Sequence, residues 1–265
     1  MPLRLVVHGA AGRMGREVIR AAAADPAFAV AAALVRPGSP QLGLDAGVVA
    51  GAGPLGVELS ADVPAGLAAG DVAVDFSTPA AAVEFAHAAA DAGRPLVVAT
   101  TGIASEQLEA VKEEARRIPL LIAPNLSVGV SVLARLLPVI TRALGDDYDV
   151  EVIEVHHRHK KDAPSGTAIR LAEAVAAARG RALADVERYG RRGIAPRTPG
   201  EIGMHAVRAG GVVGEHRLLF VSEGEEIEIA HRAFSRQTFA LGALRAARFL
   251  VSRPPGLYTM EDVVG

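Results

Sequence analysis

Three histidines, one arginine and two lysines occupy the consecutive positions 156–161, between an apolar run and the triplet Ser-Gly-Thr. Imidazole changes charge near neutral pH, and an amine can release a proton where a guanidinium group cannot. Lys160 and Lys161 are two of the only three lysines in the chain, the third being Lys112. This concentration of titratable cations predicts proton transfer, anion binding, or both.

A helix start follows the basic residues. Asp162, Pro164, Ser165 and Thr167 are typical of a helix N-terminus, and the Ala/Leu pattern behind them ends near Gly180. Free N–H groups and hydroxyls at such a start can bind an anionic group. We therefore expect a carboxylate site at 165–167, with charge supplied by His157 and Lys160 and with His156 as an acid.

The expected strand over 149–155 leads directly into the basic run. If the chain stays extended, His156, Arg158 and Lys160 point to one face and His157 and His159 to the other. A metal site at the latter two is disfavoured, because no carboxylate stands at helical spacing and no H-E-x-x-H pattern occurs. A nucleic-acid patch is disfavoured because no aromatic residues are interleaved. We predict no metal.

The beginning of the chain has the pattern of a nucleotide-binding unit. A strand over 3–7 is followed by Gly9, Gly12 and Gly15 and then by an Ala-rich helix. Glycines allow the backbone to approach a pyrophosphate, and the helix start attracts it. Such a turn also occurs for packing reasons alone, but strands and helices continue to alternate at 29–36, 72–76, 80–93, 95–102, 105–117 and 119–125. This alternation predicts a Rossmann-type, doubly wound parallel sheet.

The residues at the end of the second strand indicate which nicotinamide cofactor is preferred. A carboxylate usually binds the ribose 2′-hydroxyl of NADH there, but this chain has Val35 and Arg36. We expect NADPH or NADH to bind, with NADPH favoured, unless Arg36 is simply a solvated loop residue. Small and hydroxyl residues follow later strands, where they either line the nicotinamide side or form ordinary turns; these are Ser77, Thr78, Thr100, Thr101 and Asn125.

The second half has a different pattern. A helix is expected over 130–144, and strands at 202–210, 212–224 and 225–234 are expected to form antiparallel meanders. A helix over 235–252 should pack back on the first domain. The predicted fold is α/β, with a dinucleotide-binding domain at 1–127 plus 237–265. A smaller α+β domain at 128–236, with an open mixed or antiparallel sheet, should bind substrate and form oligomer contacts.

Composition narrows the classes of partner. The 265 residues are 50% hydrophobic, with a formal net charge of −2 and no cysteine. A near-neutral chain has no bulk attraction for nucleic acid or anionic membrane, and the absence of cysteine excludes disulfides and thiolate chemistry. The first residues lack the apolar segment of a signal peptide, and no run approaches the roughly 18 apolar residues of a membrane span. We expect a cytoplasmic protein with a small-molecule partner.

The chain resembles the 4-hydroxy-tetrahydrodipicolinate reductase (dihydrodipicolinate reductase) family. The resemblance runs from about residue 3 to GLYTMEDVV near the end, through GAAGRMG, DFSTP, TTG, APNLSVGVSVL and above all EVIEVHHRHKKDAPSGTA. It implies NAD(P)H-dependent reduction of a cyclic imine dicarboxylate to tetrahydrodipicolinate and water, in the diaminopimelate route to lysine. It also implies a homotetramer built through the sheet of the second domain.

The resemblance assigns roles residue by residue. His156 would be the proton donor and Lys160 a second acid, and the substrate carboxylates would be bound by His157, Lys160, Ser165, Gly166 and Thr167. The matching cofactor positions are Gly9, Ala10, Ala11, Gly12, Arg13, Met14, Arg36, Ala99, Thr100, Thr101, Ala123, Pro124, Asn125 and Leu126. Many members carry an acidic residue in place of Val35 and a glycine in place of Ala99, and the first departure puts NADH preference in doubt.

Two alternative functions stay open at this point. One is a two-domain NAD(P)H reductase of another small anionic substrate, which turnover of a different imine or semialdehyde would indicate. The other is a non-catalytic protein that senses NADPH. A sensor has no need of an acid pair, so His156 and Lys160 count against it.

Overall fold

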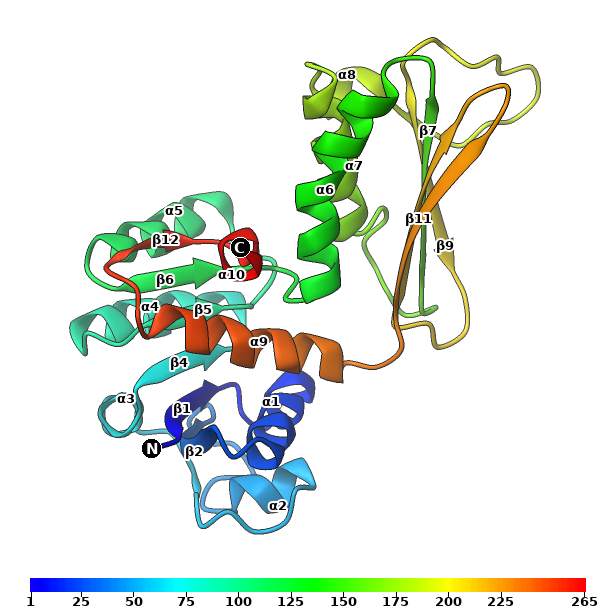
Figure 1. Cartoon of the computed structure of the whole chain (residues 1–265). Helices are drawn as coiled ribbons and strands as arrows, with labels where there is room; N and C mark the ends of the chain where they lie inside the picture. The colour runs from blue at the N-terminus through cyan, green and yellow to red at the C-terminus, as the bar shows by residue number, and fades with distance from the viewer. The chain divides into compact units, whose positions relative to one another are not determined.

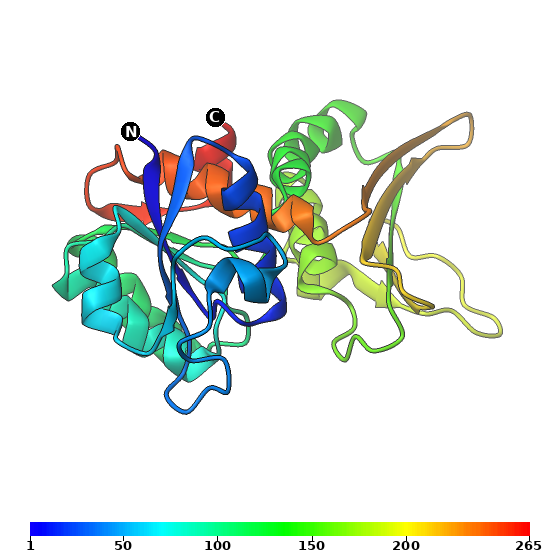
Figure 2. The same ribbon diagram turned by 90° about the horizontal axis from the view of Figure 1, so that it is seen from below.

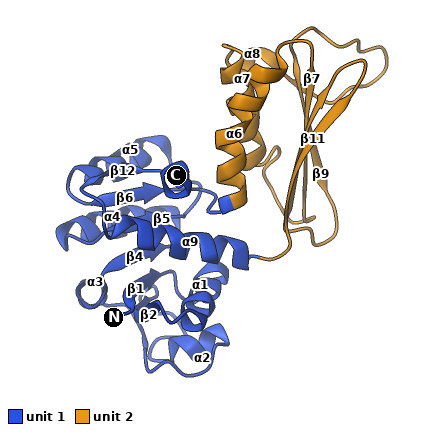
Figure 3. Ribbon diagram, viewed as in Figure 1, with its two compact units in different colours: residues 1–128, 236–265 blue, residues 129–235 orange.

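The computed structural model describes all 265 residues and divides into two compact units. Unit 1 comprises Met1–Val128 and Arg236–Gly265, and unit 2 comprises Gly129–Ser235 (Figure 3). Each unit has its own sheet and its own buried core. None of the helices combines the length and the hydropathy that a membrane span requires.

Unit 1 contains a seven-stranded sheet in which every pair of neighbours is parallel, in the order β12-β6-β5-β4-β1-β2-β3. The strands are β1 (Leu3–His8), β2 (Phe28–Leu34), β3 (Leu59–Ser60), β4 (Val72–Asp75), β5 (Leu96–Val98), β6 (Pro119–Ile122) and β12 (Gly256–Tyr258). The predicted doubly wound parallel sheet is confirmed. Continuous burial of β4 and β5 is typical of strands that are covered on both faces.

Helices cover both faces of this sheet (Figure 1). One core includes residues of α1 (Arg13–Ala24), α2 (Ala46–Ala50), α9 (Gln237–Leu250) and α10 (Met260–Val264). The other includes residues of α3 (Val63–Ala69), α4 (Pro79–Asp91) and α5 (Ser105–Glu113), which a short 3₁₀ turn at Glu114–Arg116 follows. The helix expected over 235–252 therefore belongs to the first unit, as predicted.

Unit 2 contains a five-stranded mixed sheet in the order β11-β10-β7-β9-β8. Its strands are β7 (Asp149–His156), β8 (Glu187–Tyr189), β9 (Ile202–Arg208), β10 (Gly214–Val221) and β11 (Glu226–Ala233). Its helices α6 (Val128–Leu144), α7 (Gly166–Ala178) and α8 (Leu183–Val186) lie on one side of the sheet, and no helix covers the other (Figure 2). Alternate side chains of β7 and β10 are buried, as expected for strands with one covered face.

The expected antiparallel meander is wrong for β9. Only β10 and β11 form an antiparallel hairpin, whereas β9 pairs parallel to β7, which lies between β9 and β10. The connection 157–201, which includes α7, returns the chain so that β9 runs in the same direction as β7. A parallel partner requires such a long crossover, and strand patterns alone do not reveal the order.

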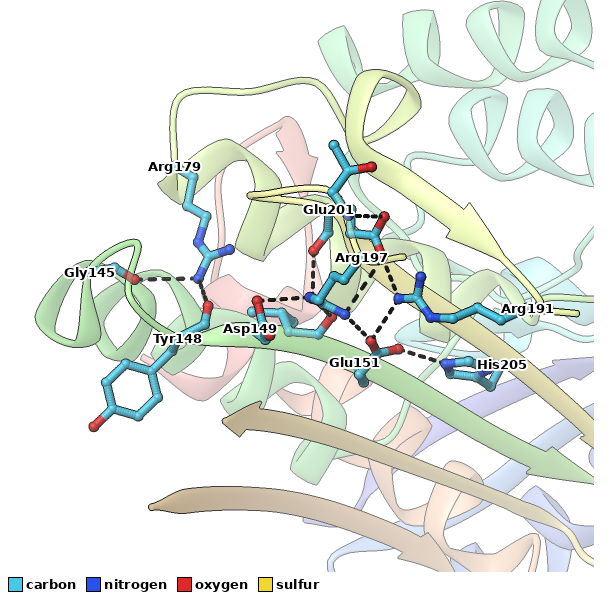
Figure 4. Close-up of polar contacts among 11 residues, drawn as sticks. Gly145, Tyr148, Asp149, Glu151, Arg179, Arg191, Arg197, Glu201 and His205 are labelled. Atoms are coloured by element: carbon cyan, nitrogen blue, oxygen red, sulfur yellow. Dashed lines mark hydrogen bonds and ion pairs between the residues drawn. The ribbon is translucent and has the colours of Figure 1, made fainter. Parts of the chain in front are cut away.

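A cluster of charges holds the loop 190–201 to the uncovered side of this sheet (Figure 4). Arg191 and Arg197 both contact the carboxylates of Glu151 and Glu201. His205 Nε2 lies 2.6 Å from Glu151 Oε2. Gly203 leaves room for this carboxylate, because a Cβ there would stand 1.6 Å from Glu151 Oε2. The network attaches a long loop to the sheet by paired charges rather than by apolar burial.

Candidate active site

The basic run at the end of β7 forms a turn and does not stay extended. β7 ends at His156, and the Lys160 N–H donates to the His157 carbonyl oxygen at 3.0 Å. The predicted division of side chains between two faces is therefore wrong, because this hydrogen bond closes a four-residue turn. His156 is buried on the helix-covered side of the sheet, His157 and Lys160 are half-buried, and Arg158 and His159 are exposed.

The predicted helix start is confirmed at Ser165. Its backbone is extended, and its Oγ accepts from the Ala168 N–H at 3.2 Å as the N-cap of α7. Gly166 and Thr167 are the first helical residues, and a Cβ placed on Gly166 would meet no atom within 4 Å. The space beside Gly166 at this helix start is therefore open.

A buried carboxylate that was not predicted from the sequence connects these groups. Glu154 is 1% exposed, and its Oε2 lies 2.6 Å from His156 Nδ1 while its Oε1 accepts from the Ser165 N–H at 3.0 Å. Arg208 donates to both oxygens, each at 2.7 Å. The alternation of β7 contained the signal, because Glu154 falls in phase with the buried Val150 and Val152. Arg208 gave no such signal, since its place opposite His156 depends on the strand order.

His216 lies on the other side of the same group. Its Nε2 is 3.0 Å from Ser165 Oγ, and its ring meets that of His156 edge-on at 5.2 Å between centroids. Burial, together with His156 and His231, lowers the pKa of His216 to about 3, so its ring is neutral near pH 7. A neutral ring donates from one nitrogen only, and Nδ1 has no partner.

The groups around His156 have opposite effects on its pKa. Burial lowers its pKa, the Glu154 carboxylate raises it, and Lys160 and Arg208 lower it, with a net lowering. Burial alone would raise the pKa of Glu154, but hydrogen bonds from Arg208 and His156 bring it below the ordinary value. Glu154 is therefore ionised at neutral pH. Lys160 Nζ lies 2.8 Å from Asp162 Oδ2.

The glycine turn of unit 1 forms a tight cradle between β1 and α1. Gly9 has φ +74°, and a Cβ there would stand 2.4 Å from the Phe76 carbonyl oxygen. A Cβ at Gly15 would stand 2.3 Å from the Gly9 carbonyl oxygen. Gly12 is the N-cap of α1 and no side chain caps this helix, so its first N–H groups remain available to an anion.

The other predicted cofactor residues lie at the carboxyl ends of neighbouring strands of the same sheet. Arg36 follows β2 and is exposed, with no ion pair. Ala99, Thr100 and Thr101 follow β5, and the segment 123–126 follows β6. Ala10 and Ala11 lie in the glycine turn, and Arg13 and Met14 are the first residues of α1. The predicted cofactor positions therefore all lie in unit 1, in the glycine turn or after the carboxyl ends of strands of one sheet.

A buried aspartate uses the hydroxyls of two of these turns. Asp75 is fully buried and accepts from Ser77 Oγ and from Thr100 Oγ1, each at 2.6 Å. The Ser77 N–H donates to Thr100 Oγ1 at 2.9 Å, and His8 Nδ1 lies 2.7 Å from Asp75 Oδ1. For Ser77 and Thr100, the structure therefore favours the turn-forming role of the hydroxyl over direct contact with a ligand.

Known proteins match the chain over nearly its whole length. Two family models match, described as dihydrodipicolinate reductase N-terminus at residues 3–126 and C-terminus at residues 129–264. A 4-hydroxy-tetrahydrodipicolinate reductase of Rubrobacter xylanophilus is 52% identical over 262 residues, covering 99% of this chain and 98% of that protein. One of Anaeromyxobacter dehalogenans is 50% identical over 263 residues, covering 99% and 97%.

Solved structures have the same fold. A dipicolinate-bound dihydrodipicolinate reductase from Paenisporosarcina sp. TG-14 matches with a TM-score of 0.76 at 24% identity, covering 99% of each chain. A myo-inositol dehydrogenase from Lactobacillus casei, in complex with NAD(H) and myo-inositol, matches with a TM-score of 0.62 at 14% identity, covering 100% of this chain and 91% of that one. At these identities the likeness concerns the fold alone.

Proposed function

Since the chain belongs to the dihydrodipicolinate reductase family, we propose that it reduces 4-hydroxy-tetrahydrodipicolinate with His156 as the proton donor. The chain is an oxidoreductase of the diaminopimelate route to lysine, and it uses a nicotinamide cofactor. The observation that carries the proposed role of His156 is its pairing with buried Glu154 beside the open start of α7.

The start of α7 suits one carboxylate of the substrate. The N–H groups of Gly166 and Thr167 and the Ser165 hydroxyl can donate to it, while His157 and Lys160 supply positive charge. The same chemistry would bind dipicolinate, the planar dicarboxylate present in the Paenisporosarcina structure.

His156 Nε2 is the atom proposed to deliver the proton, because Nδ1 faces Glu154. Burial lowers the pKa of His156 in the free protein. A dianionic substrate adds negative charge nearby, which raises the pKa of an imidazole and favours its protonated, acidic form. Lys160 is proposed as the second acid.

The glycine cradle and the uncapped α1 fit a dinucleotide. A bound NAD(P)H supplies the hydride. The pyrophosphate would lie against Gly9–Met14, and residues 99–101 and 123–126 would flank the nicotinamide side. We propose a preference for NADPH, supported by exposed, unpaired Arg36 and by Val35, which offers no carboxylate to repel a 2′-phosphate.

A homotetramer in the cytoplasm is proposed as the working form. The uncovered side of the unit 2 sheet supports an assembly, because half-buried Ile153, Val155 and Leu219 lie there without a covering helix. The biosynthetic role supports the location. Sedimentation of the purified protein measures the number of copies.

The proposed function is tested by NAD(P)H oxidation with the condensation product of pyruvate and aspartate semialdehyde, generated in the assay. We expect turnover, and we expect His156→Ala to lower kcat about 100-fold or more while KM changes little, because a proton donor acts in the transition state. His159→Ala is the matched control, since His159 is an exposed histidine of the same turn. Dinucleotide binding without turnover would support the sensor, and an unchanged kcat in His156→Ala would refute the acid role.

A further inference from the structure

We propose that Glu154 is a positioning residue that fixes both the proton donor and the carboxylate-binding helix start, and that Gly214 keeps the space in front of His156 Nε2 open. The inference rests on the proposed function, because it gives Glu154 no role except through His156 and Ser165.

The Glu154 carboxylate sets the tautomer of His156. An ionised carboxylate only accepts hydrogen bonds, so the 2.6 Å contact between Oε2 and Nδ1 requires the proton to be on Nδ1. In the neutral ring Nε2 then has a lone pair, and it is the nitrogen that gains and gives up the transferable proton. Glu154 thus determines which nitrogen serves the reaction.

The second oxygen of the same carboxylate holds the helix start. Oε1 accepts the Ser165 N–H at 3.0 Å, and Ser165 is the N-cap of α7. The proton donor and the proposed carboxylate site therefore share one anchor, 1% exposed and 11 residues away from Ser165 in sequence. A substrate held at this helix start meets a ring whose orientation is fixed by the same group.

Arg208 keeps this anchor ionised and in place. It binds both Glu154 oxygens at 2.7 Å, and its Nη2 also donates to the Asp162 carbonyl oxygen at 2.5 Å. The groups that face the His156 ring are then Glu154, which favours its cationic form, and Lys160 and Arg208, which oppose it, with neutral His216 edge-on.

Gly214 provides an independent observation on the same atom. A Cβ at this position would stand 3.1 Å from His156 Nε2 and 3.4 Å from its Cδ2. The ring is held from behind by Glu154, so it has little freedom to retreat from an added methyl group. Gly214→Ala should therefore disturb Nε2 without altering any contact of Glu154.

The first experiment combines Glu154→Gln, His156→Ala and the double variant, assayed as full-length protein. We expect Glu154→Gln to lower kcat at least about tenfold and to leave NADPH affinity unchanged. Activity requires protonated His156, so kcat/KM decreases as the pH rises through the pKa of this ring. Loss of the carboxylate lowers that pKa, and the decrease should therefore begin at a lower pH in Glu154→Gln than in the unsubstituted protein. The double variant should have the kcat of His156→Ala alone, because Glu154 affects proton transfer through His156, while its effect on the Ser165 helix start would be seen in KM.

Two further measurements keep the inference testable if Glu154→Gln fails to fold. Heteronuclear NMR of histidine-labelled, unsubstituted protein should show neutral His156 protonated at Nδ1. Gly214→Ala should lower kcat with unchanged NADPH affinity, whereas Gly211→Ala, a control with no atom within 4 Å of the added Cβ, should not. Glu228→Gln is the matched carboxylate control, since Glu228 is an exposed residue paired with Arg217.

The outcomes separate the two proposals. If His156→Ala keeps its kcat, the acid assignment in the proposed function is wrong. If His156→Ala is inactive but Glu154→Gln has the original kcat and pH profile, or if neutral His156 is protonated at Nε2, only the role of Glu154 is overturned. If the effects of the two substitutions on kcat multiply in the double variant, Glu154 does not act on proton transfer through His156, and that part of its role is overturned.

Discussion

At the scale of single residues, nearly every buried charged side chain has a charged or hydrogen-bonding partner. Glu154 contacts Arg208 and His156, and Asp75 accepts hydrogen bonds from Ser77 and Thr100 and lies 2.7 Å from His8 Nδ1. Arg36 differs, because it stands exposed after β2 without an ion pair. A solvated arginine at the ribose end of a dinucleotide site is available for a ligand phosphate.

Arg36→Ala should therefore lower affinity for NADPH more than affinity for NADH. Losing one charge-assisted phosphate contact costs about 1.5–3 kcal/mol, which corresponds to about a 10- to 150-fold rise in the Kd of NADPH alone. Titration that follows the fluorescence of the reduced cofactor, or calorimetry with each cofactor, measures the two Kd values. Arg253→Ala, another exposed arginine of unit 1, is the control. An equal loss for both cofactors would show that Arg36 does not contact the 2′-phosphate.

The sequence predicted several residues of the proposed site, and the residues that it did not predict share one physical reason. The histidines, Lys160 and the Ser165 cap were recognisable because each acts near its neighbours in sequence. Arg208 and His216 reach the site only through the pairing of β9 and β10 with β7. Their roles depend on strand order, which local patterns do not contain.

At the scale of elements, α9 shows how closely unit 1 is packed. Small residues line its buried side, including Ala240, Ala243 and Ala247. A Cβ at Gly242 would stand 1.8 Å from the Leu126 carbonyl oxygen. The helix therefore packs directly on the backbone of the segment 123–126, which follows β6 and is proposed to contact the cofactor.

Gly242→Ala should destabilise the protein by about 2 kcal/mol or more. Alanine gains about 1 kcal/mol in helix propensity over glycine, but overpacking against backbone has a larger cost because the carbonyl cannot rotate away as a side chain can. Urea unfolding followed by circular dichroism measures the change. Leu241→Ala, at a neighbouring position that is 53% exposed, should change stability much less. A stabilised Gly242→Ala would mean that α9 can shift at no cost.

Most elements were predictable, with boundaries within a few residues, because their apolar periods are strong. The short elements α2, β3, α3, α8, β8, β12 and α10 were not expected. They contain two to seven residues each, too few to establish a period. Tertiary pairing stabilises them, as β3 pairs with β2 and β8 with β9.

At the scale of the whole molecule, buried histidines should make folding sensitive to acid. The pKa of His216 is lowered by burial to about 3, whereas an unfolded histidine titrates near 6.5. Between these two pH values the unfolded chain binds one more proton than the folded chain. The contribution of His216 to the free energy of unfolding is therefore fully present above about pH 6.5, and it decreases on acidification by about 1.4 kcal/mol per pH unit. Burial also lowers the pKa of His156 and of His231, which adds to the slope.

Urea unfolding at a series of pH values from 7 to 4 tests this expectation. His216→Gln should flatten the slope, and His87→Gln should not, because His87 is an exposed histidine at the surface of unit 1. Equal slopes in the unsubstituted protein and in His216→Gln would show that His216 takes up its proton in the folded state.

The division of the chain also sets the order in which its two cores can be completed during synthesis. Unit 2 is one continuous segment, Gly129–Ser235, whereas unit 1 needs α9 and β12 from Arg236–Gly265 to finish its sheet and one of its faces. A ribosome delivers the whole of unit 2 before it delivers α9. The first part of unit 1 is therefore synthesised with Val97, Leu121 and other core residues not yet covered by α9. Unit 2, which is made next, already has all of its strands before α9 is available.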